Sequence, residues 1–339
     1  MKFLDLFAGI GGFRLGMEAA GHECVGFCEI DKFARESYKA IHDTKGEIEL
    51  HDITAVSDET VRGIGQVDVI CGGFPCQAFS IAGKRQGFED TRGTLFFEIA
   101  RFASILRPRL LFLENVKGLL NHDRGNTFEI ILSALDELGY DVEWQVLNSK
   151  NFGVPQNRER VFIIGHLRGG SGRKVFPLSG DGETITCEQP KINKVGNIRK
   201  KGKSQSGDVV SIDSLAPTLC STTTQKDPLK IAIREATAQG YTEAEVGDSV
   251  NLSHPNSKTR RGRVGKQIAN TLLTGESQGV VEPDFRIRKL TPKECWRLQG
   301  FPDWAFDKAQ EVNSNSQLYK QAGNSVTVNV IAAIAKELE

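Results

Sequence analysis

The sequence lacks several features that mark whole classes of protein. It has no apolar run long enough to cross a bilayer, and its N-terminus meets Asp5 and then glycines before the apolar core of a signal peptide could form. Its seven cysteines are an odd number with irregular spacing and no CxxC pair, which argues against a disulfide framework and a zinc site. These absences predict a cytoplasmic protein with reduced thiols and no zinc site.

A net charge is also absent, because 43 Lys and Arg residues balance 43 Asp and Glu residues. The balance is uneven along the chain, since the stretch from Arg168 to Asp284 carries 17 basic and 13 acidic residues. A local positive face can contact phosphates without an excess of positive charge overall. What is present is the composition of an ordinary globular protein, and 339 residues suggest two domains or one large domain with an insert.

The first part of the chain alternates short apolar runs with helical patterns. Residues 3–7 form an apolar run that enters a glycine turn before a helix, and residues 24–28 form a second run that ends at Glu29. In nucleotide-binding α/β folds the acid at this point hydrogen-bonds a ribose, although a charge favoured at a helix N-terminus is an alternative for Glu29. The predicted fold is α/β, with a doubly wound, Rossmann-like sheet. The spacing Gly9-x-Gly11-Gly12 is not GxGxxG and counts against an NAD-dependent oxidoreductase.

Two further apolar runs, predicted to be neighbouring buried strands, end in reactive groups. Residues 67–71 run into a loop that contains Cys76, and residues 110–113 run into Glu114. Open α/β sheets bind ligands at the carboxyl ends of their strands. A lone cysteine is usually an inert small hydrophobe and a lone strand-end glutamate a solvated acid, but together they suggest a nucleophile and a general acid. Arg158 and Arg160 precede another strand and project to one face, as surface cations or as a pair that binds a polar group.

The composition changes at about residue 169, where Gly, Ser, Thr, Lys and Asn become dominant. Helical periodicity is expected there only at residues 231–238. Residues 214–219 and 267–272 look like a degenerate repeat, or like a coincidence of short strand patterns. A capping box with proline at the first helical position predicts a helix over residues 291–298, and residues 321–326 introduce a terminal helix that returns to the first domain. The predicted units are residues 1–168, 169–285 and 286–339.

Five segments occur in the order typical of DNA (cytosine-5) methyltransferases: residues 5–12, 72–80, 114–116, 156–160 and 321–326. The chain resembles that family, and its bacterial restriction-modification members in particular, over residues 1–166 and 286–339. The resemblance implies a methyltransferase domain that binds S-adenosylmethionine and releases S-adenosylhomocysteine, with a smaller, mostly β or irregular target-recognition domain. It implies duplex DNA as substrate, no metal, a bacterial or phage origin, a monomer, and a cognate restriction endonuclease as a candidate partner.

The same resemblance assigns roles to the reactive residues. The Cys76 thiolate would attack carbon 6 of cytosine, because carbon 5 alone is a poor nucleophile. Glu114 would hold or protonate ring nitrogen 3, which requires a carboxyl group kept partly protonated by its surroundings. Arg160 would contact the base carbonyl with Arg158 beside it. The groups expected to orient the base are Asn115 and Gln156.

Two further sets of residues follow from the resemblance. The cofactor set is Phe7, Gly9, Gly11, Glu29, Ile30, Asp52, Ile53, Phe74, Pro75, Leu95, Asn324 and Val326. Many relatives have an aromatic residue at the position of Ile30, so adenine packing is expected to differ there. The DNA set is Ser80, Lys84 and Arg85, on a loop that would close on a flipped-out base, together with Gln205 and Thr218 in the recognition region.

Two alternatives use the same scaffold. An RNA cytosine-5 methyltransferase is disfavoured by a DNA-type insert of over 100 residues, and a catalytically idle DNA- or cofactor-binding protein is disfavoured by the presence of Cys76, Glu114 and Arg160. The DNA sequence that is read does not follow from the residues. If the repeat is real, its two modules would read separate parts of one site or two different sites.

Overall fold

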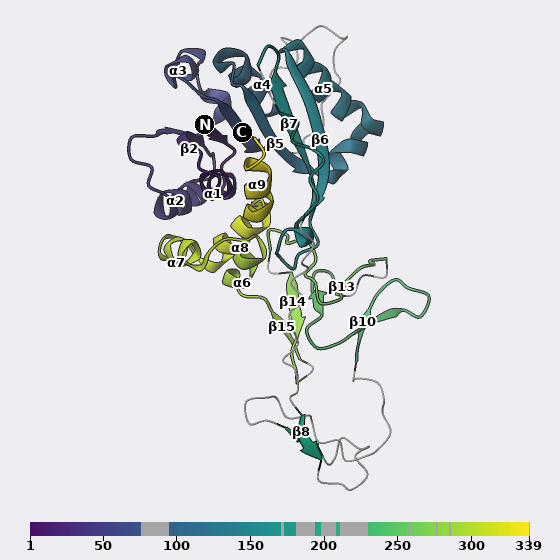
Figure 1. Cartoon of the computed structure of the whole chain (residues 1–339). Helices are drawn as coiled ribbons and strands as arrows, with labels where there is room; N and C mark the ends of the chain where they lie inside the picture. The colour runs from purple at the N-terminus through teal and green to yellow at the C-terminus, as the bar shows by residue number, and fades with distance from the viewer. Residues whose placement is uncertain are drawn as a thin grey trace.

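The computed structural model describes residues 1–75, 95–170, 173–180, 230–255, 257, 259–275, 277–284 and 286–338, together with the backbone of residues 194–197 and 208–210. A seven-stranded sheet in the order β3-β2-β1-β4-β5-β7-β6 forms its centre (Figure 1). The strands are β1 (Lys2–Leu6), β2 (Glu23–Cys28), β3 (Ile48–Leu50), β4 (Val69–Gly73), β5 (Leu110–Val116), β6 (Tyr140–Asn148) and β7 (Glu159–Leu167). The first five run parallel, and β7 lies antiparallel between β5 and β6. The predicted doubly wound α/β fold is confirmed.

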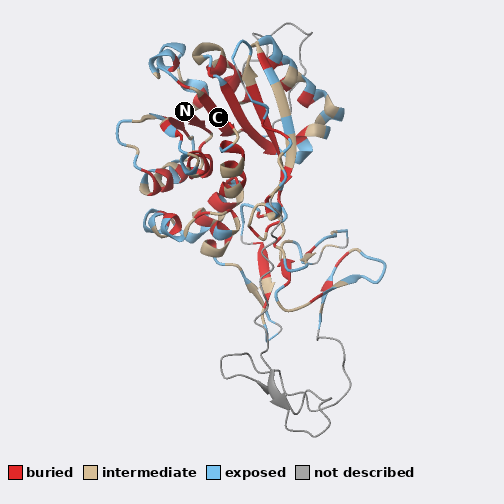
Figure 2. Ribbon diagram, in the orientation of Figure 1, coloured by how far each residue is buried: buried red, intermediate tan, exposed pale blue. Residues whose placement is uncertain are grey.

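Alternation along the strands creates a core on each face of this sheet. On β5, Leu111 and Leu113 pack toward one face, while Leu110 and Phe112 pack toward the other. The first face is covered by α3 (Asp58–Gly63), α4 (Leu95–Leu106) and α5 (Asn126–Glu137), and the second by α1 (Gly12–Ala19) and α9 (Val328–Ala335). Figure 2 shows burial concentrated in the sheet strands and in the helix faces that cover them. The central strands are therefore held rigidly by packing on both sides.

A third core forms around Trp296, which is fully buried and whose indole Nε1 donates to the Leu318 carbonyl at 3.0 Å. It joins α2 (Lys32–Ile41) to α6 (Pro292–Leu298), α7 (Asp303–Val312) and α8 (Asn315–Asn324). The predicted capping box of α6 is confirmed, because Thr291 and Glu294 bond reciprocally. Residues 321–324, expected to precede a terminal helix, instead complete α8. The sequence reading also missed α3 and α7.

The C-terminal helix α9 packs against the region where the chain starts. His22, just before β2, contacts the Met1 amino group through Nδ1 at 3.4 Å and the Ala335 carbonyl through Nε2 at 3.1 Å. The two ends of the chain accordingly lie close together in Figure 1. Residues from the end of the sequence can therefore complete a site built by the first strands.

Small antiparallel sheets lie beyond α6 and the start of β7 (Figure 1). Their strands are β8 (Lys194–Asn197) with β9 (Asp208–Val210), β10 (Ile231–Arg234) with β11 (Tyr241–Ala244), and the group β12 (Ser249–Asn251), β13 (Val264–Gly265), β14 (Gln278–Val281) and β15 (Ile287–Lys289). The helix expected over residues 231–238 is wrong. Ile233 is buried while Ala232 and Arg234 are exposed, which is the two-residue period of a strand, and β-branched isoleucines favour that conformation.

Within the described ranges, no helix is both long and apolar enough to cross a membrane. The same ranges contain no group of three His, Cys, Asp or Glu residues that could hold a metal ion.

Candidate active site

A pocket of about 450 Å³ opens at the carboxyl edge of the sheet, where β1 and β4 lie side by side. The chain order reverses at this point, since β2 and β3 extend to one side and β5 to the other. Open α/β sheets bind ligands at such a switch point, and the volume lies within the roughly 300–1,000 Å³ of ligand pockets. Residues at or just after the carboxyl ends of β1, β2, β4 and β5 line it, together with the end of α8.

The reactive end of the pocket is created by the antiparallel direction of β7. Because β7 starts at the edge where β5 ends, Val116 lies opposite Arg160 in the register. Arg160 Nε consequently lies 3.0 Å from Glu114 Oε1, and both side chains are largely buried. Burial raises the pKa of Glu114, and the charges of Arg160 and Arg158 oppose that rise. The carboxyl group is thus held where it can carry a proton and hydrogen-bond a polar ring.

Asn115 connects the end of β5 to the loop that follows β4. Its Nδ2 donates to the Phe74 carbonyl at 2.8 Å, and its Oδ1 accepts from the Val116 amide at 2.8 Å. Phe74 and Pro75 both line the pocket, and Cys76 is the next residue in the chain. Cys76 itself lies outside the described residues, as do the predicted DNA contacts Ser80, Lys84, Arg85, Gln205 and Thr218.

Arg158 is a buried cation rather than a surface one. Its Nη2 donates to the carbonyls of Gly323 and Ser325, at 3.2 and 2.7 Å, and so ties the start of β7 to the end of α8. Burial, with repulsion from Arg160, lowers the pKa of Arg158 to about 9. Its Nε and Nη1 are buried and have no hydrogen-bond partner among the described residues. A buried donor without a partner is costly, and Arg158 is one of the residues that line the pocket.

Gln156 does not line the pocket, although it was expected to orient the base. Its amide is fully buried, with Nε2 donating to the Leu298 carbonyl at 2.8 Å and Oε1 accepting from the Leu272 amide at 3.2 Å. Thr271 Oγ1 donates to the Asn157 carbonyl at 2.7 Å, and Ala269 pairs with Gln156 in a parallel bridge. The contacts therefore make Gln156 a link between the second repeat-like segment and the entrance to β7. The sequence reading selected Thr218 and did not foresee the place of Thr271.

The opposite end of the pocket is organised by Glu29, directly after β2. Its Oε2 accepts from the Gly9 amide at 2.8 Å and its Oε1 from the Asp31 amide at 2.7 Å. Burial raises the pKa of Glu29, and these two N–H groups oppose that rise. Gly9 has a φ of +56°, which favours glycine, and the space beside its Cα is open. A fixed carboxylate beside open backbone suits a ligand with hydroxyl groups.

Asp52 marks the far wall of this end of the pocket. It caps a short 3-10 helix, η1 (Ile53–Ala55), through Oδ1, which accepts from the Thr54 amide at 3.0 Å and the Thr54 hydroxyl at 2.7 Å. Asp52 and Ile53 both line the pocket. Among the described residues, the hydrogen bonds to the Asp52 carboxylate all go to Oδ1.

Most of the cofactor residues expected from the sequence meet in this one pocket. The lining includes Phe7, Gly9, Glu29, Ile30, Asp52, Ile53, Phe74, Pro75, Leu95 and Asn324. Gly11 and Val326 are not part of it. Gly11 instead permits the close approach of His42, with which a Cβ would collide, and the Val326 side chain packs under Gly12.

The pocket lining also contains residues to which the sequence analysis gave no role, although five of them lie within its segments 72–80, 114–116 and 321–326. These are Ile10, Cys28, Asp31, Ala34, His51, Gly73, Val116, Lys320, Gln321, Gly323 and Ser325. Lys320 on α8 reaches Asp31 at the start of α2, with Nζ 2.6 Å from Oδ2. Burial of Asp31 opposes ionisation, but Lys320 and the helix N–H groups prevail and lower its pKa. Nothing in the sequence signals this pair, because its members are 289 positions apart.

Comparison with known proteins identifies the family. The family model of C-5 cytosine-specific DNA methylases matches residues 1–339. The chain is 39% identical to the type II methyltransferase M.HpaII of Haemophilus parainfluenzae, with 99% of this chain and 88% of that protein covered. It is 36% identical to the type II methyltransferase M.HhaI of Haemophilus parahaemolyticus, with 99% and 93% covered. The solved structure of the S. pombe Dnmt2 methyltransferase shares the fold, with a TM-score of 0.58 and 19% identity over 100% of this chain and 98% of that one.

The resemblance expected from five short segments is therefore confirmed along the whole chain. This family assignment agrees with the pocket at the switch point of the sheet. One end of the pocket holds the buried Glu114–Arg160 pair, and the other holds the Glu29 carboxylate, which is fixed by backbone amides. The protein belongs to the C-5 cytosine-specific DNA methylase family and is an enzyme that methylates carbon 5 of cytosine in DNA.

Proposed function

We propose that the pocket binds S-adenosylmethionine and the target cytosine side by side. The family uses S-adenosylmethionine. In this chain Glu29 would accept from the ribose hydroxyls, Asp52 from the adenine amino group, and the backbone at Gly9 would leave room for the methionine part. The cytosine would lie at the other end, against Glu114 and Arg160, with Arg158 beside them.

When bound, S-adenosylmethionine supplies the methyl group. The Cys76 thiolate attacks carbon 6 of the cytosine, and Glu114 donates to ring nitrogen 3, so that electron density moves to carbon 5. Arg160 holds the base carbonyl and keeps the Glu114 carboxyl in place. After methylation a base takes the carbon 5 proton, the carbon 5–carbon 6 double bond re-forms, the Cys76 sulfur leaves as a thiolate, and the proton on nitrogen 3 returns to Glu114.

The target base lies inside a duplex, so we propose that the enzyme flips it out, at a cost of a few kcal/mol. Residues 1–168 and 286–339 would form the catalytic unit, and residues 169–285 the unit that reads the DNA. Ser80, Lys84, Arg85, Gln205 and Thr218 remain predicted DNA contacts. We further propose that the chain acts as a monomer in the cytoplasm, where a cognate endonuclease would be its partner.

One observation carries the assignment: the buried Glu114–Arg160 pair lines the same pocket as the fixed Glu29 carboxylate. A carboxyl group whose pKa is raised by burial can donate a proton to a ring nitrogen, while a carboxylate fixed by backbone amides serves hydroxyl recognition. The two ends differ in chemistry, as a site for two different substrates requires.

A duplex that contains 5-fluorocytosine tests the covalent step. Fluorine at carbon 5 prevents the final proton loss, so the wild-type enzyme with cofactor should form a complex that survives denaturing electrophoresis. The Cys76→Ser variant should bind cofactor and DNA but form no such complex. Cofactor binding without an adduct in the wild type would instead support the catalytically idle alternative, and methylation of tRNA but not of duplex DNA would support the RNA alternative.

A further inference from the structure

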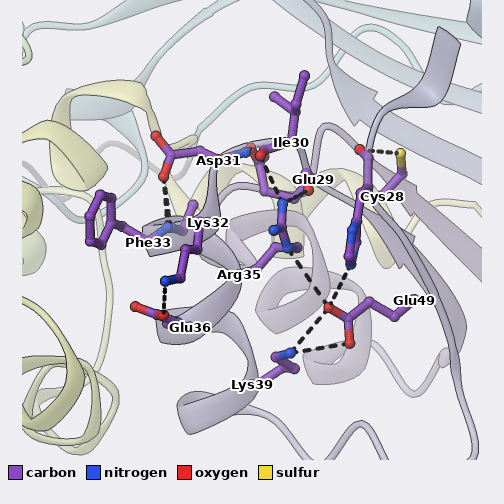
Figure 3. Close-up of polar contacts among 12 residues, drawn as sticks. Cys28, Glu29, Ile30, Asp31, Lys32, Phe33, Arg35, Glu36, Lys39 and Glu49 are labelled. Carbon is purple, nitrogen blue, oxygen red and sulfur yellow. Dashed lines mark hydrogen bonds and ion pairs between the residues drawn. The ribbon is translucent and has the colours of Figure 1, made fainter. Parts of the chain in front are cut away.

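The backbone that carries Glu29 is held at its carbonyls by the Arg35 side chain and at the Glu29 amide by the Leu50 carbonyl of β3, 3.1 Å away. Arg35 lies at the end of the first turn of α2, and its Nη1 donates to two successive carbonyls, those of Glu29 at 2.8 Å and Ile30 at 2.7 Å (Figure 3). Both oxygens of the Glu29 carboxylate already accept backbone N–H groups. The turn is therefore fixed through its carbonyls as well as through its acid.

Arg35 has an ion-pair partner in Glu49 on β3. Glu49 Oε1 lies 3.8 Å from Arg35 Nε and 3.1 Å from Lys39 Nζ (Figure 3). The same oxygen lies 3.2 Å from His51 Nε2. Burial raises the pKa of Glu49, but hydrogen bonds from Lys39 and His51 outweigh it and lower the pKa. The carboxylate thus joins α2 to the segment that leads into Asp52. Arg35 itself is only 15% exposed in its side chain.

Packing does little to hold this turn, because Ile30 is 68% exposed. An exposed aliphatic side chain makes few contacts that would restrict the backbone around it. Asp31 caps α2, with its Oδ1 accepting from the amides of Phe33 and Ala34 at 2.9 and 3.1 Å. The conformation of the turn between β2 and α2 therefore depends on polar contacts. Arg35 makes two of them, to the carbonyls of Glu29 and Ile30.

We propose that Arg35 is a positioning residue for the cofactor, which fixes the turn so that the Glu29 carboxylate meets the ribose hydroxyls. The inference rests on the proposed cofactor site but concerns a residue outside the pocket lining. Arg35 acts through Glu29, so its effect should appear only with ligands that carry those hydroxyls. A residue that merely stabilised α2 would affect every ligand of the pocket equally.

Calorimetry with two probes separates these roles. The probes are S-adenosylhomocysteine and its analogue without the two ribose hydroxyls, each titrated into the full-length protein without DNA. Arg35→Gln should weaken S-adenosylhomocysteine binding by about 10-fold or more, the scale for charge-assisted hydrogen bonds, and the analogue by less than about 3-fold. With saturating cofactor the turnover number should stay near that of the wild type, because only the cofactor KM depends on Arg35.

Lys32→Gln is the matched control. It makes the same charge change on the same helix, at a side chain that is 74% exposed and 3.8 Å from Glu36, and should leave both affinities unchanged. Glu49→Gln is a second test variant, which keeps Arg35 but removes the charge of its ion-pair partner. It should weaken S-adenosylhomocysteine binding more than analogue binding, but by a smaller factor than Arg35→Gln. Thermal unfolding of each variant checks that the fold is retained.

Equal weakening of both probes by Arg35→Gln and Glu49→Gln, or no weakening of either, would overturn the inference while leaving the cofactor site in place. A wild-type protein that binds neither probe would overturn the proposed cofactor site and the inference together.

Discussion

Replacement of Glu114 by glutamine tests the acid that the structure places beside Arg160. The amide keeps the size and hydrogen-bonding shape of the side chain, so the pocket should retain its form, but it cannot deliver a proton. Loss of a general acid typically costs about 10²–10⁴-fold in rate. At about 1.36 kcal/mol for each tenfold, the activation barrier should rise by roughly 2.7–5.4 kcal/mol. S-adenosylhomocysteine affinity should hardly change, because Glu29 lies at the other end of the pocket.

The assay is transfer of a labelled methyl group to duplex DNA at saturating cofactor, measured across pH. Burial holds the pKa of Glu114 above its ordinary value, so the wild-type rate should fall as pH rises through that raised pKa and the carboxyl group loses its proton. Glu114→Gln should lack this descending limb. Glu159→Gln, which changes an exposed acid paired with Lys117, is the control and should keep both rate and pH profile. A Glu114→Gln rate within about threefold of the wild type would refute the reasoning.

Three further outcomes follow from the structure. Trp296→Ala should lower the free energy of unfolding by about 3–5 kcal/mol in urea denaturation, since it empties a fully buried site and removes the indole hydrogen bond to the Leu318 carbonyl; a loss below about 1 kcal/mol would contradict that. Burial and the nearby Arg14 charge lower the pKa of His42 from 6.5 to about 3, so the unfolded chain binds more protons between these values and stability should fall as pH drops through this window. His42→Gln should flatten that fall in urea midpoints measured from pH 7 to pH 4, and an unchanged slope would exclude His42 as its cause. DNA affinity should fall steeply as salt rises, because phosphate contacts release counterions, and an affinity independent of salt would argue against phosphate contacts.

Much of the catalytic sheet could be predicted, because its strands are short apolar runs that end in polar residues. The positions of Glu29 and Glu114 followed from that pattern, since parallel strands bring their carboxyl ends to one edge. The predicted face shared by Arg158 and Arg160 also agrees with their common place in the pocket lining. What the sequence could not give was the antiparallel direction of β7, which sets Arg160 against Glu114.

Residues that depend on long-range contacts were harder to predict. Lys320 and Asp31 form a pair across the pocket only because α8 returns to α2 through the core around Trp296. Gln156 looked like a substrate group because of its place in a motif, yet both ends of its amide bind backbone from other segments. Gly11 likewise belongs to a motif, but its freedom is used for the approach of His42. The motifs thus predicted where the pocket lies, while contacts between distant segments determine which motif residues line it.

In the predicted recognition region, residues 169–285, local sequence was also insufficient to predict the structure. Its sequence has little periodicity, so a short run such as residues 231–234 can resemble a helix until its antiparallel partner at residues 241–244 is known. The structural role of residues 267–272 follows from the hydrogen bond of Thr271 to Asn157, at the entrance to β7, and not from the sequence pattern. Pairing between distant segments, rather than local propensity, determines structure there.

Bisulfite sequencing of genomic DNA from cells that express this chain, beside cells that express Cys76→Ser, tests whether the enzyme methylates cytosine in DNA through Cys76. We expect protected cytosines confined to one short sequence, or to two if both repeat-like segments read DNA. The variant should protect none above background. The same methylation in both cultures, or none in either although the wild-type protein is folded and binds S-adenosylhomocysteine, would contradict that expectation.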